Sequence, residues 1–587
     1  MRVLGVQVGH DSSAALVVDG RIVADVAEER FTRIKHYCGL PLSSIEYCLR
    51  AGGVSIRDID VVAVPAAGPV VHLHHLFAED YERPRLRVAL DPARRNANRE
   101  ILKLPLYVKR YPLPRSTPVV HVEHHLAHAA SAYYTSGSSK RQLVVTMDGM
   151  GDGASACIFR GEGGKLVPQK RVAANGSIGW FYSNVTEALG WWHGDGEGKT
   201  MGLAPYGDSE RARGVLDRFY PKFEAGDLVE AHDFGPAGHW DEAGFVHCHF
   251  DDAYAIRALV ERHGREHVAA EAQRVLEEQT AKLIFPWLER ERTRNLSCSG
   301  GVFLNVKLNQ RLWESGRVAR HHVYPNPADS GLAAGAALFA YFDAHPGARI
   351  PPLETIYLGP EYPAPEIEAA LKLRNLSYRR VEDPAAFAAE QLAAGKIVAW
   401  FQGRMEAGPR ALGNRSILMS TDRAENKDII NARVKFREPF RPFCPSLLWE
   451  HRADYLEHER DELFMITSFT CRPAKRSRVP AVVHADATLR PQTVKRKHNA
   501  RFWELIRRFG DLTGEPLVLN TSLNIKGEPM INHPREAIRC FYDSGLDHLV
   551  LGHFVLSKPA APTRPTRRRA RRPSARPATR SRAASAR

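Results

Sequence analysis

Two histidines four residues apart, His124 and His128, have the spacing of metal ligands. They lie in an Ala-rich stretch that favours a helix, in which four residues make about one turn, so both imidazoles can face one ion. Asp148, at the end of a strand-like segment, and Asp329, in NPADSG, could supply two further ligands. The alternative is a helix that carries one capping and one packed histidine. No glutamate follows the first histidine as in HExxH, so a zinc protease has little support.

Glycine-rich loops between strand-like segments form a second pattern. One occupies residues 9–13, and a similar strand, loop and strand unit occupies residues 141–160. A third, Gly300-Gly301, follows a strand-like segment and precedes a predicted helix. Glycine lets backbone N–H groups approach a phosphate closely, and a helix N-terminus favours an anion. Each loop alone could be a simple turn, but the three in this order predict the phosphate clasp of actin-like and sugar-kinase-like ATPases.

Basic side chains recur in the C-terminal part of the chain among Gly, Asn and Ser rather than among acids. They lie in residues 403–416, in residues 431–443, at Arg490 and in residues 520–529. A pocket for an anionic small molecule needs such a setting. The alternative is a set of surface arginines, although the surrounding prolines and phenylalanines indicate ordered structure.

The elements that must position these residues divide the chain into α/β domains. A length of 587 residues is too great for one core. Residues 1–345 are predicted as one domain, which includes a hairpin about Asp19-Gly20 and a long amphipathic helix over 263–290. A proline-bearing linker near residue 350 precedes a second domain at 346–557, with a helix over 385–395 and a strand over 397–401.

Residues 558–587 are predicted to be a disordered, dispensable tail. They hold Lys558 and ten arginines with no acid, so +11 of the net charge of +15 lies there and the remainder carries +4. The folded part therefore lacks the charge of a nucleic-acid-binding face.

The apolar share of 44% and charged share of 25% are typical of a globular protein. We expect a cytoplasmic protein, since the sequence shows no signal-peptide pattern and no apolar run of membrane-spanning length. Its eight cysteines are scattered without CxxC spacing, which favours reduced thiols.

Nine segments resemble, in order, the landmarks of the O-carbamoyltransferases related to nodulation protein U, which include enzymes that carbamoylate cephem, ansamycin and aminoglycoside antibiotics. The segments span about residues 1–555 and read HDSSAAL, EERFTRIKH, EHHLAHAASAYY, MDGMGDG, GEGKTMGLAPYG, SGGVFLN, GPRALGNRSI, KFREPFRPF and NTSLNIKGEP. The resemblance implies an N-terminal duplicated α/β domain of the actin/Hsp70 (ASKHA) type, related to the universal tRNA threonylcarbamoyl transferase, and a C-terminal YrdC-like α/β domain. The C-terminal domain would turn carbamoyl phosphate and ATP into carbamoyl-adenylate, and the N-terminal domain would pass the carbamoyl group to an alcohol.

The resemblance also assigns residues to roles. The implied metal ligands, with Fe(II) the expected ion, are His124, His128, Asp148 and Asp329. Contacts to ATP, which binds with Mg(II), or to carbamoyl-adenylate are expected from Gly149, Gly151, Asp152, Lys199, Gly300, Gly301 and Asn305. Carbamoyl phosphate is expected to bind Lys435, Arg441, Arg490, Asn520 and Ser522, with Lys526 as the candidate for a fourth basic position. The base that activates the alcohol is His10 or Asp11, unless that loop serves only to bind phosphate.

Two other classes of function remain as alternatives. A tRNA-modifying threonylcarbamoyl-type transferase would need a basic folded face. A regulatory actin-like ATPase would keep the glycine loops and have no use for KFREPFRPF. The expected partner is a hydroxylated small molecule, such as an antibiotic or other secondary metabolite, with no nucleic acid and no membrane, and a homodimer is left open.

Overall fold

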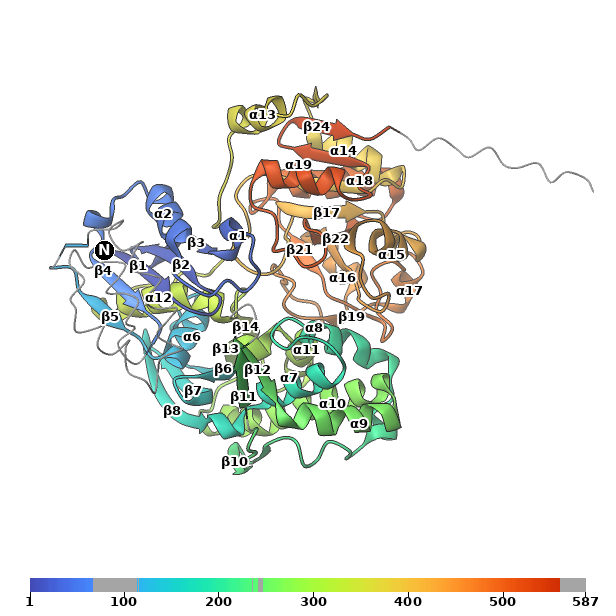
Figure 1. Ribbon diagram of the computed structural model, residues 1–587. Helices are drawn as coiled ribbons and strands as arrows, with labels where there is room; N and C mark the ends of the chain where they lie inside the picture. Colours follow the sequence, from blue (N-terminus) through green and yellow to red (C-terminus); the bar gives the residue numbers. More distant parts are fainter. Residues whose placement is uncertain (67–112, 115, 235, 241–245, 560–587) are drawn as a thin grey trace, which may run out of the picture.

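The computed structural model describes residues 1–66, 113–114, 116–234, 236–240 and 246–559, so the predicted tail lies almost wholly outside the described residues (Figure 1). The described chain contains two five-stranded sheets in its N-terminal part and one eight-stranded sheet in its C-terminal part. Figure 1 shows the two N-terminal lobes beside each other and the C-terminal domain against both of them. The chain is therefore an α/β protein, as predicted.

The first lobe is built on a sheet of order β3-β2-β1-β4-β5. Its strands are β1 (Arg2–Gln7), β2 (Ser13–Val18), β3 (Arg21–Ala27), β4 (Val61–Val64) and β5 (Val119–His121). The first three are antiparallel neighbours, whereas β4 and β5 run parallel to β1. Between β2 and β3, Asp19 and Gly20 adopt φ of 47° and 77°, as a tight Asp-Gly hairpin turn requires, which confirms the predicted hairpin.

The second lobe repeats this plan in a sheet of order β14-β13-β6-β7-β8. Its strands are β6 (Gln142–Gly151), β7 (Ala154–Glu162), β8 (Lys165–Ala173), β13 (Asn295–Ser299) and β14 (Arg320–Val323). Three antiparallel strands are again followed by two parallel ones, because β13 runs parallel to both β6 and β14. The duplication predicted from the two glycine-rich hairpins is confirmed, and it is the α/β architecture of actin/Hsp70-type domains.

Two Ala-rich helices, α6 (His124–Tyr133) and α12 (Leu332–Ala344), pack between the lobes. Glycines allow their close approach. A Cβ on Gly335 of α12 would lie 2.0 Å from the carbonyl oxygen of Ala127 on α6, and a Cβ on Gly5 of β1 would lie 1.9 Å from that of Ala333. These contacts hold α6 against α12, and α12 against the sheet of the first lobe. They therefore fix the direction in which the histidines of α6 point.

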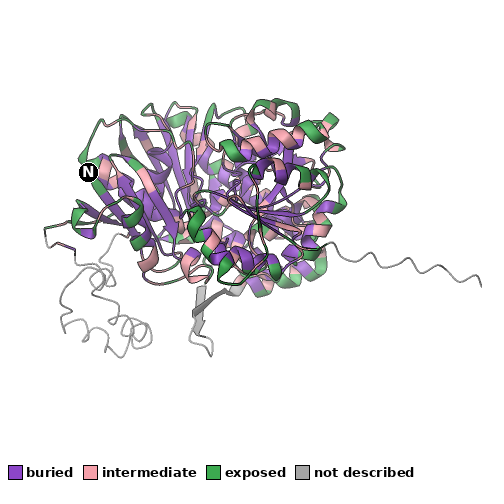
Figure 2. Cartoon of the chain, turned by 90° about the horizontal axis from the view of Figure 1, so that it is seen from above, coloured by how far each residue is buried: buried purple, intermediate pink, exposed green. Residues whose placement is uncertain are grey.

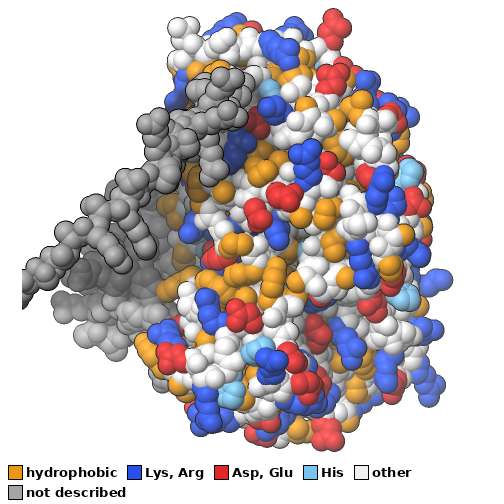
Figure 3. Space-filling view, turned by 90° about the vertical axis from the view of Figure 1, so that its right-hand side faces the viewer, with side chains coloured by type: hydrophobic (Ala, Val, Ile, Leu, Met, Phe, Trp, Pro, Cys, Tyr) orange, Lys and Arg blue, Asp and Glu red, His pale blue; other side chains and the backbone are white. Residues whose placement is uncertain are grey.

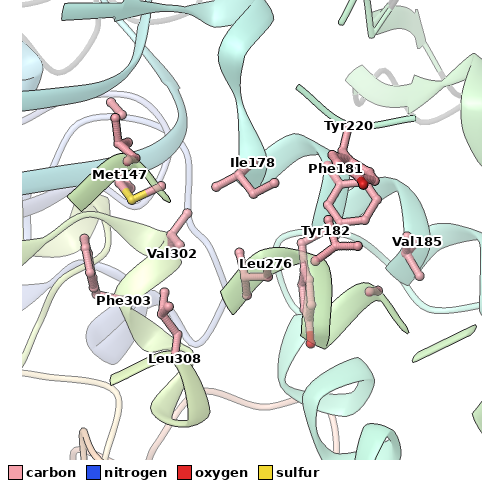
Figure 4. Packing of buried hydrophobic residues seen from close by; sticks show 14 of the residues in the cluster. Met147, Ile178, Phe181, Tyr182, Val185, Tyr220, Leu276, Val302, Phe303 and Leu308 are labelled. Carbon is pink, nitrogen blue, oxygen red and sulfur yellow. The ribbon is translucent and has the colours of Figure 1, made fainter. Parts of the chain in front are cut away.

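Five further helices cover the second lobe: α7 (Ile178–Ala188), α8 (Glu197–Leu203), α9 (Asp251–His263), α10 (Arg265–Arg290) and α11 (Val306–Glu314). Figure 4 shows Tyr182 of α7 beside Leu276 of α10 in the buried core, with Phe303 and Met147 on the other side of Leu276. The long helix predicted over 263–290 is confirmed as α10, although Gly264 at φ 91° separates it from α9.

The C-terminal domain is organised around a mixed sheet of order β15-β24-β23-β16-β17-β22-β18-β21. Its strands are β15 (Arg379–Arg380), β16 (Val398–Phe401), β17 (Arg415–Met419), β18 (Cys444–Leu448), β21 (Gln492–Val494), β22 (Leu517–Ser522), β23 (His548–Leu551) and β24 (Phe554–Ser557). Helices pack on both faces, with α14 (Pro384–Ala393) and α18 (Ala500–Thr513) on one and α13 (Ala364–Lys372) and α19 (Pro534–Tyr542) on the other. The helix and strand predicted over 385–401 are confirmed as α14 and β16.

The remaining elements are short. They are α1 (Glu29–Thr32), α2 (Leu42–Ala51), β9 (Lys222–Glu224), β10 (Asp227–Glu230), β11 (Pro236–Trp240), β12 (Val246–Phe250), α15 (Glu425–Ile430), a π-helical turn (Asn431–Lys435), α16 (Arg452–Tyr455), β19 (Phe469–Thr470), α17 (Pro473–Arg476) and β20 (Thr488–Leu489). Figure 2 shows the buried residues concentrated in the sheets and on the inner helix faces. The seven cysteines whose side chains are described are free thiols. Among the described residues, no helix combines the length and apolar character needed to cross a bilayer.

Candidate metal centre and anion pocket

The predicted metal ligands come together between the lobes. His124 Nε2 and His128 Nε2, one turn apart on α6, lie 3.4 and 3.2 Å from Asp148 Oδ2 at the end of β6. Asp329 Oδ1 lies 3.9 and 3.6 Å from the same two nitrogens. The four ligand atoms all lie within 4.8 Å of one another. Two imidazoles and two carboxylates around one point fit a divalent transition metal.

The electrostatics of this cluster favour bound positive charge. Burial would raise the pKa of Asp148, but its contacts with His124 and His128 hold that pKa well below its usual value. Burial would likewise lower the pKa of His124, yet Asp148 and Asp329 raise it to about 9. The carboxylates therefore stabilise a cation here, whether it is a proton on an imidazole or a metal ion that displaces it.

Neighbouring groups orient the ligands. Asp152 Oδ2 accepts a hydrogen bond of 2.8 Å from the backbone N–H of His124 at the start of α6, and Ser299 Oγ lies 3.4 Å from His128 Nδ1. His125, between them in the chain, points elsewhere: its ring nitrogens lie 2.9 Å from Thr146 Oγ1 and 3.0 Å from a backbone carbonyl. Burial lowers the pKa of His125 to about 3, so it is a neutral structural residue.

The glycines assigned to the nucleotide also pack around the metal cluster. A Cβ on Gly151 would lie 2.1 Å from the His124 ring, and one on Gly301 would lie 3.0 Å from Asp148 Oδ1. Gly300 adopts φ of 103°, where a Cβ would lie 2.1 Å from the carbonyl oxygen of Met147. A Cβ on Gly149 would meet the Trp180 ring at 2.8 Å. Gly151 and Gly301 therefore form a cradle for the cluster, whereas the contact of all four glycines with a nucleotide stays a prediction.

The three polar residues assigned to the nucleotide have partners within the protein. Asp152 holds the first turn of α6, as described. Asn305 Oδ1 accepts hydrogen bonds of 3.0 Å from both the Leu308 N–H and Gln273 Nε2, and so caps α11. Lys199 Nζ lies 3.8 Å from Glu438 Oε1, so the structure places it against the C-terminal domain.

The first glycine-rich loop carries a second cluster, which includes the two candidate bases. Asp11 Oδ2 lies 3.1 Å from His10 Nδ1, and Asp11 Oδ1 lies 2.8 Å from His36 Nδ1. Burial would lower the pKa of His36, but its contacts with Asp11 and Asp195 raise it to about 10. The charge of Asp148 acts on the pKa of Asp11, so this loop lies within electrostatic reach of the metal cluster.

These contacts separate the roles of the two histidines. His36 stays protonated near neutral pH and cannot accept a proton, whereas the His10 side chain is 63% exposed and is oriented by Asp11. The sequence prediction missed His36 and Asp195. His36 lies in EERFTRIKH and Asp195 in the loop before GEGK, and only the fold brings either of them to the first glycine-rich loop.

The C-terminal domain holds a cluster of cations with few anions. Lys435, Arg441 and Arg490, each assigned from the sequence, converge with Arg410 and Arg437, which lie in the predicted basic segments but were not singled out there. Burial, reinforced by the neighbouring charges of this group, lowers the pKa of Arg410 and of Arg437 to about 9. Like charges held together in a partly buried site favour a bound anion, and we call this cluster the arginine pocket.

Within this cluster, the charge of Arg410 is poorly compensated by hydrogen bonds. Its buried Nε has no hydrogen-bond partner among the residues that the structure describes. By contrast, Arg437 Nε donates to Asn431 Oδ1 over 2.9 Å, and Arg441 Nη1 lies 3.8 Å from Glu438. A buried N–H without a partner is costly, so the Nε of Arg410 stands to gain from a bound anion.

The predicted amide and hydroxyl residues line the same region. Lys435 Nζ donates to Asn524 Oδ1 over 2.6 Å and lies 3.4 Å from Ser522 Oγ, while burial holds the pKa of Lys435 well below its usual value. Asn520 Nδ2 donates to Ser446 Oγ, and its buried Oδ1 lacks a partner among the described residues. Lys526 lies near enough to Glu438 to lower its pKa, which places it at the edge of the pocket.

Family comparison decides what kind of protein carries these two sites. The family described as carbamoyltransferase N-terminus matches residues 2–338, and that described as carbamoyltransferase C-terminus matches residues 389–558. The chain belongs to the carbamoyltransferase family. The first match covers both lobes and the metal cluster, and the second covers the arginine pocket. The resemblance seen in the sequence is thus confirmed, and the protein is a carbamoyltransferase.

Relatives of this carbamoyltransferase align over nearly its whole length. Nodulation protein NolNO of Sinorhizobium fredii NBRC 101917/NGR234 is 35% identical over 94% of this chain and 79% of its own. Nodulation protein U of the same strain is 30% identical over 96% of this chain and 100% of its own. Protein sll1178 of Synechocystis is 34% identical over 94% of this chain and 96% of its own.

Solved structures similar to this carbamoyltransferase share little sequence with it. Full-length HypF in a phosphate- and nucleotide-bound form is 14% identical and covers 59% of this chain and 56% of its own, with a TM-score of 0.35. The (R)-2-hydroxyglutaryl-CoA dehydratase component A of Acidaminococcus fermentans is 16% identical over 59% of this chain and 99% of its own, with a TM-score of 0.32.

Proposed function

We propose that this carbamoyltransferase uses carbamoyl phosphate and ATP to form carbamoyl-adenylate in its C-terminal domain, and then transfers the carbamoyl group to a hydroxyl of a small natural product at the metal centre. The observation that carries the proposal is the arginine pocket, in which the partnerless Nε of Arg410 lies among other cations. Such a site needs an anion of low molecular weight, and carbamoyl phosphate supplies both the charge and the group that the family transfers.

The arginine pocket would serve the activation step. Carbamoyl phosphate loses its phosphate to water and leaves carbamate; a carbamate oxygen then attacks the α-phosphorus of ATP, carried with Mg(II), and pyrophosphate departs. Arg410, Arg437 and Arg441 would neutralise the phosphoryl oxygens in both steps. The activation matters because carbamate is a poor electrophile, whereas its adenylate has a good leaving group.

The cluster between the lobes would serve the transfer step. His124, His128, Asp148 and Asp329 would hold a divalent ion, for which we propose Fe(II), and that ion would supply Lewis-acid stabilisation of negative charge. His10 would accept the proton of the acceptor hydroxyl as its oxygen attacks the carbamoyl carbon and AMP departs. Asp11 would orient the His10 ring for that transfer.

One assay tests the proposal. The protein, loaded with Fe(II), is incubated with ATP, Mg(II) and carbamoyl phosphate, with and without a panel of hydroxylated natural products. We expect pyrophosphate release that depends on carbamoyl phosphate, and a gain of one carbamoyl group on an acceptor by mass spectrometry. Pyrophosphate release that is the same without carbamoyl phosphate would contradict the activation step, and no carbamoylated product from any panel member would contradict the transfer to such acceptors.

A further inference from the structure

A short segment of the first lobe reaches both proposed half-sites. The bridging segment, residues 28–36, contains α1 and ends at His36. Figure 1 shows α1 on the side of the first lobe that faces the C-terminal domain. Glu28 anchors the start of the segment, because its carboxylate accepts hydrogen bonds of 3.0 and 2.7 Å from the N–H groups of Ser43 and Ser44 at the beginning of α2.

The middle of the bridging segment binds loops of the arginine pocket. Arg33 donates from Nη1 to the carbonyl oxygen of Met530 over 2.8 Å and from Nη2 to that of Pro529 over 2.7 Å. Arg30, which is buried, donates to the carbonyl oxygen of Gly408, two residues before Arg410. The segment thus touches both the turn that presents Arg410 and the end of the loop that begins at Ser522.

That loop is itself tied to a pocket cation. Asn524 accepts from Lys435 Nζ over 2.6 Å through its Oδ1 and donates from Nδ2 to the carbonyl oxygen of Glu528 over 2.7 Å. The next two residues of the chain are the acceptors of the Arg33 hydrogen bonds. A shift of Lys435 towards an anion would therefore displace the groups that hold Arg33.

The end of the bridging segment reaches the first glycine-rich loop. His36 Nδ1 lies 2.8 Å from Asp11 Oδ1, and the backbone N–H of His36 donates to Glu29 Oε2 over 3.0 Å. Only two residues separate Arg33 from His36, and Arg33 and His36 themselves adopt the left-handed conformation, at φ of 65° and 54°. Since three residues span at most about 10 Å, this connection has little slack.

We infer that the bridging segment couples the two half-sites: anion binding in the arginine pocket sets the position of Arg33, and through it the position of His36 and Asp11 at the transfer site. This inference rests on the proposed function. Arg33 and His36 are positioning residues, since neither is assigned to a substrate. The device would align the first glycine-rich loop only when the activation site is loaded, and so limit loss of carbamoyl-adenylate to water.

Hydrogen exchange measured by mass spectrometry tests the coupling without a known acceptor. Carbamoyl phosphate is added to the Fe(II)-loaded full-length protein, and exchange is followed in peptides of the arginine pocket and in peptides covering residues 9–13 and 29–40. In the wild type we expect slower exchange in all of them. In Arg33→Met, carbamoyl phosphate should still slow exchange in the pocket peptides. Its slowing of exchange at residues 29–40 should be about fivefold or more smaller than in the wild type.

Matched variants separate coupling from damage to the fold. Arg33→Lys keeps the charge and one donor and should restore part of the response, whereas Arg57→Met, which removes an exposed arginine of the same lobe, should behave as the wild type. The coupling is overturned if the pocket peptides respond but residues 29–40 do not in the wild type, or if Arg33→Met keeps the full response. If the pocket peptides themselves show no response, the proposed function fails and the coupling fails with it.

Turnover gives a second measure once an acceptor is found. Arg33→Met should release pyrophosphate at about the wild-type rate, but with fewer carbamoylated products for each pyrophosphate. An unchanged ratio of product to pyrophosphate in the variant would overturn the inference, because a bridge that only stabilises the fold would reduce both together.

Discussion

Arg410 is a residue at which burial and charge are in conflict. Its guanidinium nitrogen is buried, its neighbours are cations, and no protein group among the described residues satisfies it. A protein that kept such a group only for stability would do better with an apolar side chain of similar size. The cost is offset only when an anion binds, which makes Arg410 a sharper test of the pocket than the arginines with partners.

We expect Arg410→Met to lower carbamoyl phosphate-dependent pyrophosphate release by about 10²-fold, equivalent to about 2.7 kcal/mol, because a charge-assisted contact to the anion is lost. The free energy of unfolding should be equal to or greater than that of the wild type, since the repulsion among cations is relieved. Arg423→Met, at a side chain that is 76% exposed, is the control and should change neither value. Full pyrophosphate release by Arg410→Met would remove this residue from the site.

We expect metal binding between the lobes to depend on each of the four proposed ligands. His128→Ala should release the metal, because a set of four donors rarely binds tightly after one is lost. Elemental analysis of purified protein should find about one ion per chain in the wild type and much less in the variant. His121→Ala, which removes an exposed histidine shortly before α6, should keep the metal. Equal metal content in wild type and His128→Ala would contradict the ligand assignment.

The ion pair of His36 predicts a pH dependence of stability. Its folded-state pKa of about 10 lies above the ordinary value of 6.5, so the stabilisation is complete below about pH 6.5 and is lost as the pH rises through about 10. The groups around it are Asp11, Asp195, Lys35 and His10. The difference in unfolding free energy between the wild type and His36→Gln should therefore shrink from pH 6.5 to 10, as followed by urea denaturation. A difference that stays constant over this range would contradict the pairing.

The metal ligands could be predicted from the sequence because the helical repeat places His124 and His128 on one face, whatever the rest of the fold. Arg410, Arg437 and His36 could not be singled out. Their importance comes from burial and from neighbours distant in the chain, such as Arg490 for Arg410 and Asp195 for His36. The spacing of residues in the sequence carries no information on burial or on such distant neighbours.

The duplicated hairpins could be predicted from the residues of their turns. The Asp-Gly dipeptides at residues 19–20 and 152–153 mark tight turns in which both residues adopt a positive φ. The pairing of distant strands could not be predicted, as in the C-terminal sheet, where β16 lies between β23 and β17. Strands of two residues, such as β15 and β19, are too short to show a pattern.

Gly151, the last residue of β6, packs against the His124 ring of the metal cluster. In Gly151→Ala the new Cβ would lie 2.1 Å from the His124 ring, so α6 or the end of β6 must move. We expect weaker metal binding, measured by titration of the metal-free protein, and a lower melting temperature, because overpacking typically costs about 1–3 kcal/mol. Gly198→Ala, in α8 and with open space at its Cβ, is the control and should leave metal binding unchanged. Wild-type metal affinity in Gly151→Ala would show that the cradle is not needed.

The sites of the two proposed half-reactions lie in different domains, and these domains touch through several segments. Arg404 of the C-terminal domain donates to the carbonyl oxygen of Val23 and to Tyr47 of the first lobe. The loop before α8 meets the C-terminal domain through the Trp191 and Phe440 rings, whose centroids are 5.7 Å apart. Figure 3 shows apolar and charged side chains mixed on the face turned towards the viewer. The domains therefore form one assembly, although the two clusters draw on separate parts of the chain.

Single substitutions should divide the reaction between the domains. Arg441→Ala removes a charged donor from the arginine pocket, so pyrophosphate release that depends on carbamoyl phosphate should fall by about 10²-fold or more. His124→Ala alters only the metal cluster, so it should retain that release while failing to give carbamoylated product. Pre-made carbamoyl-adenylate should restore product formation to Arg441→Ala but not to His124→Ala, as measured by mass spectrometry. If both folded variants lose both half-reactions to the same extent, the two clusters act as one composite site between the domains, and the separation of activation from transfer is wrong.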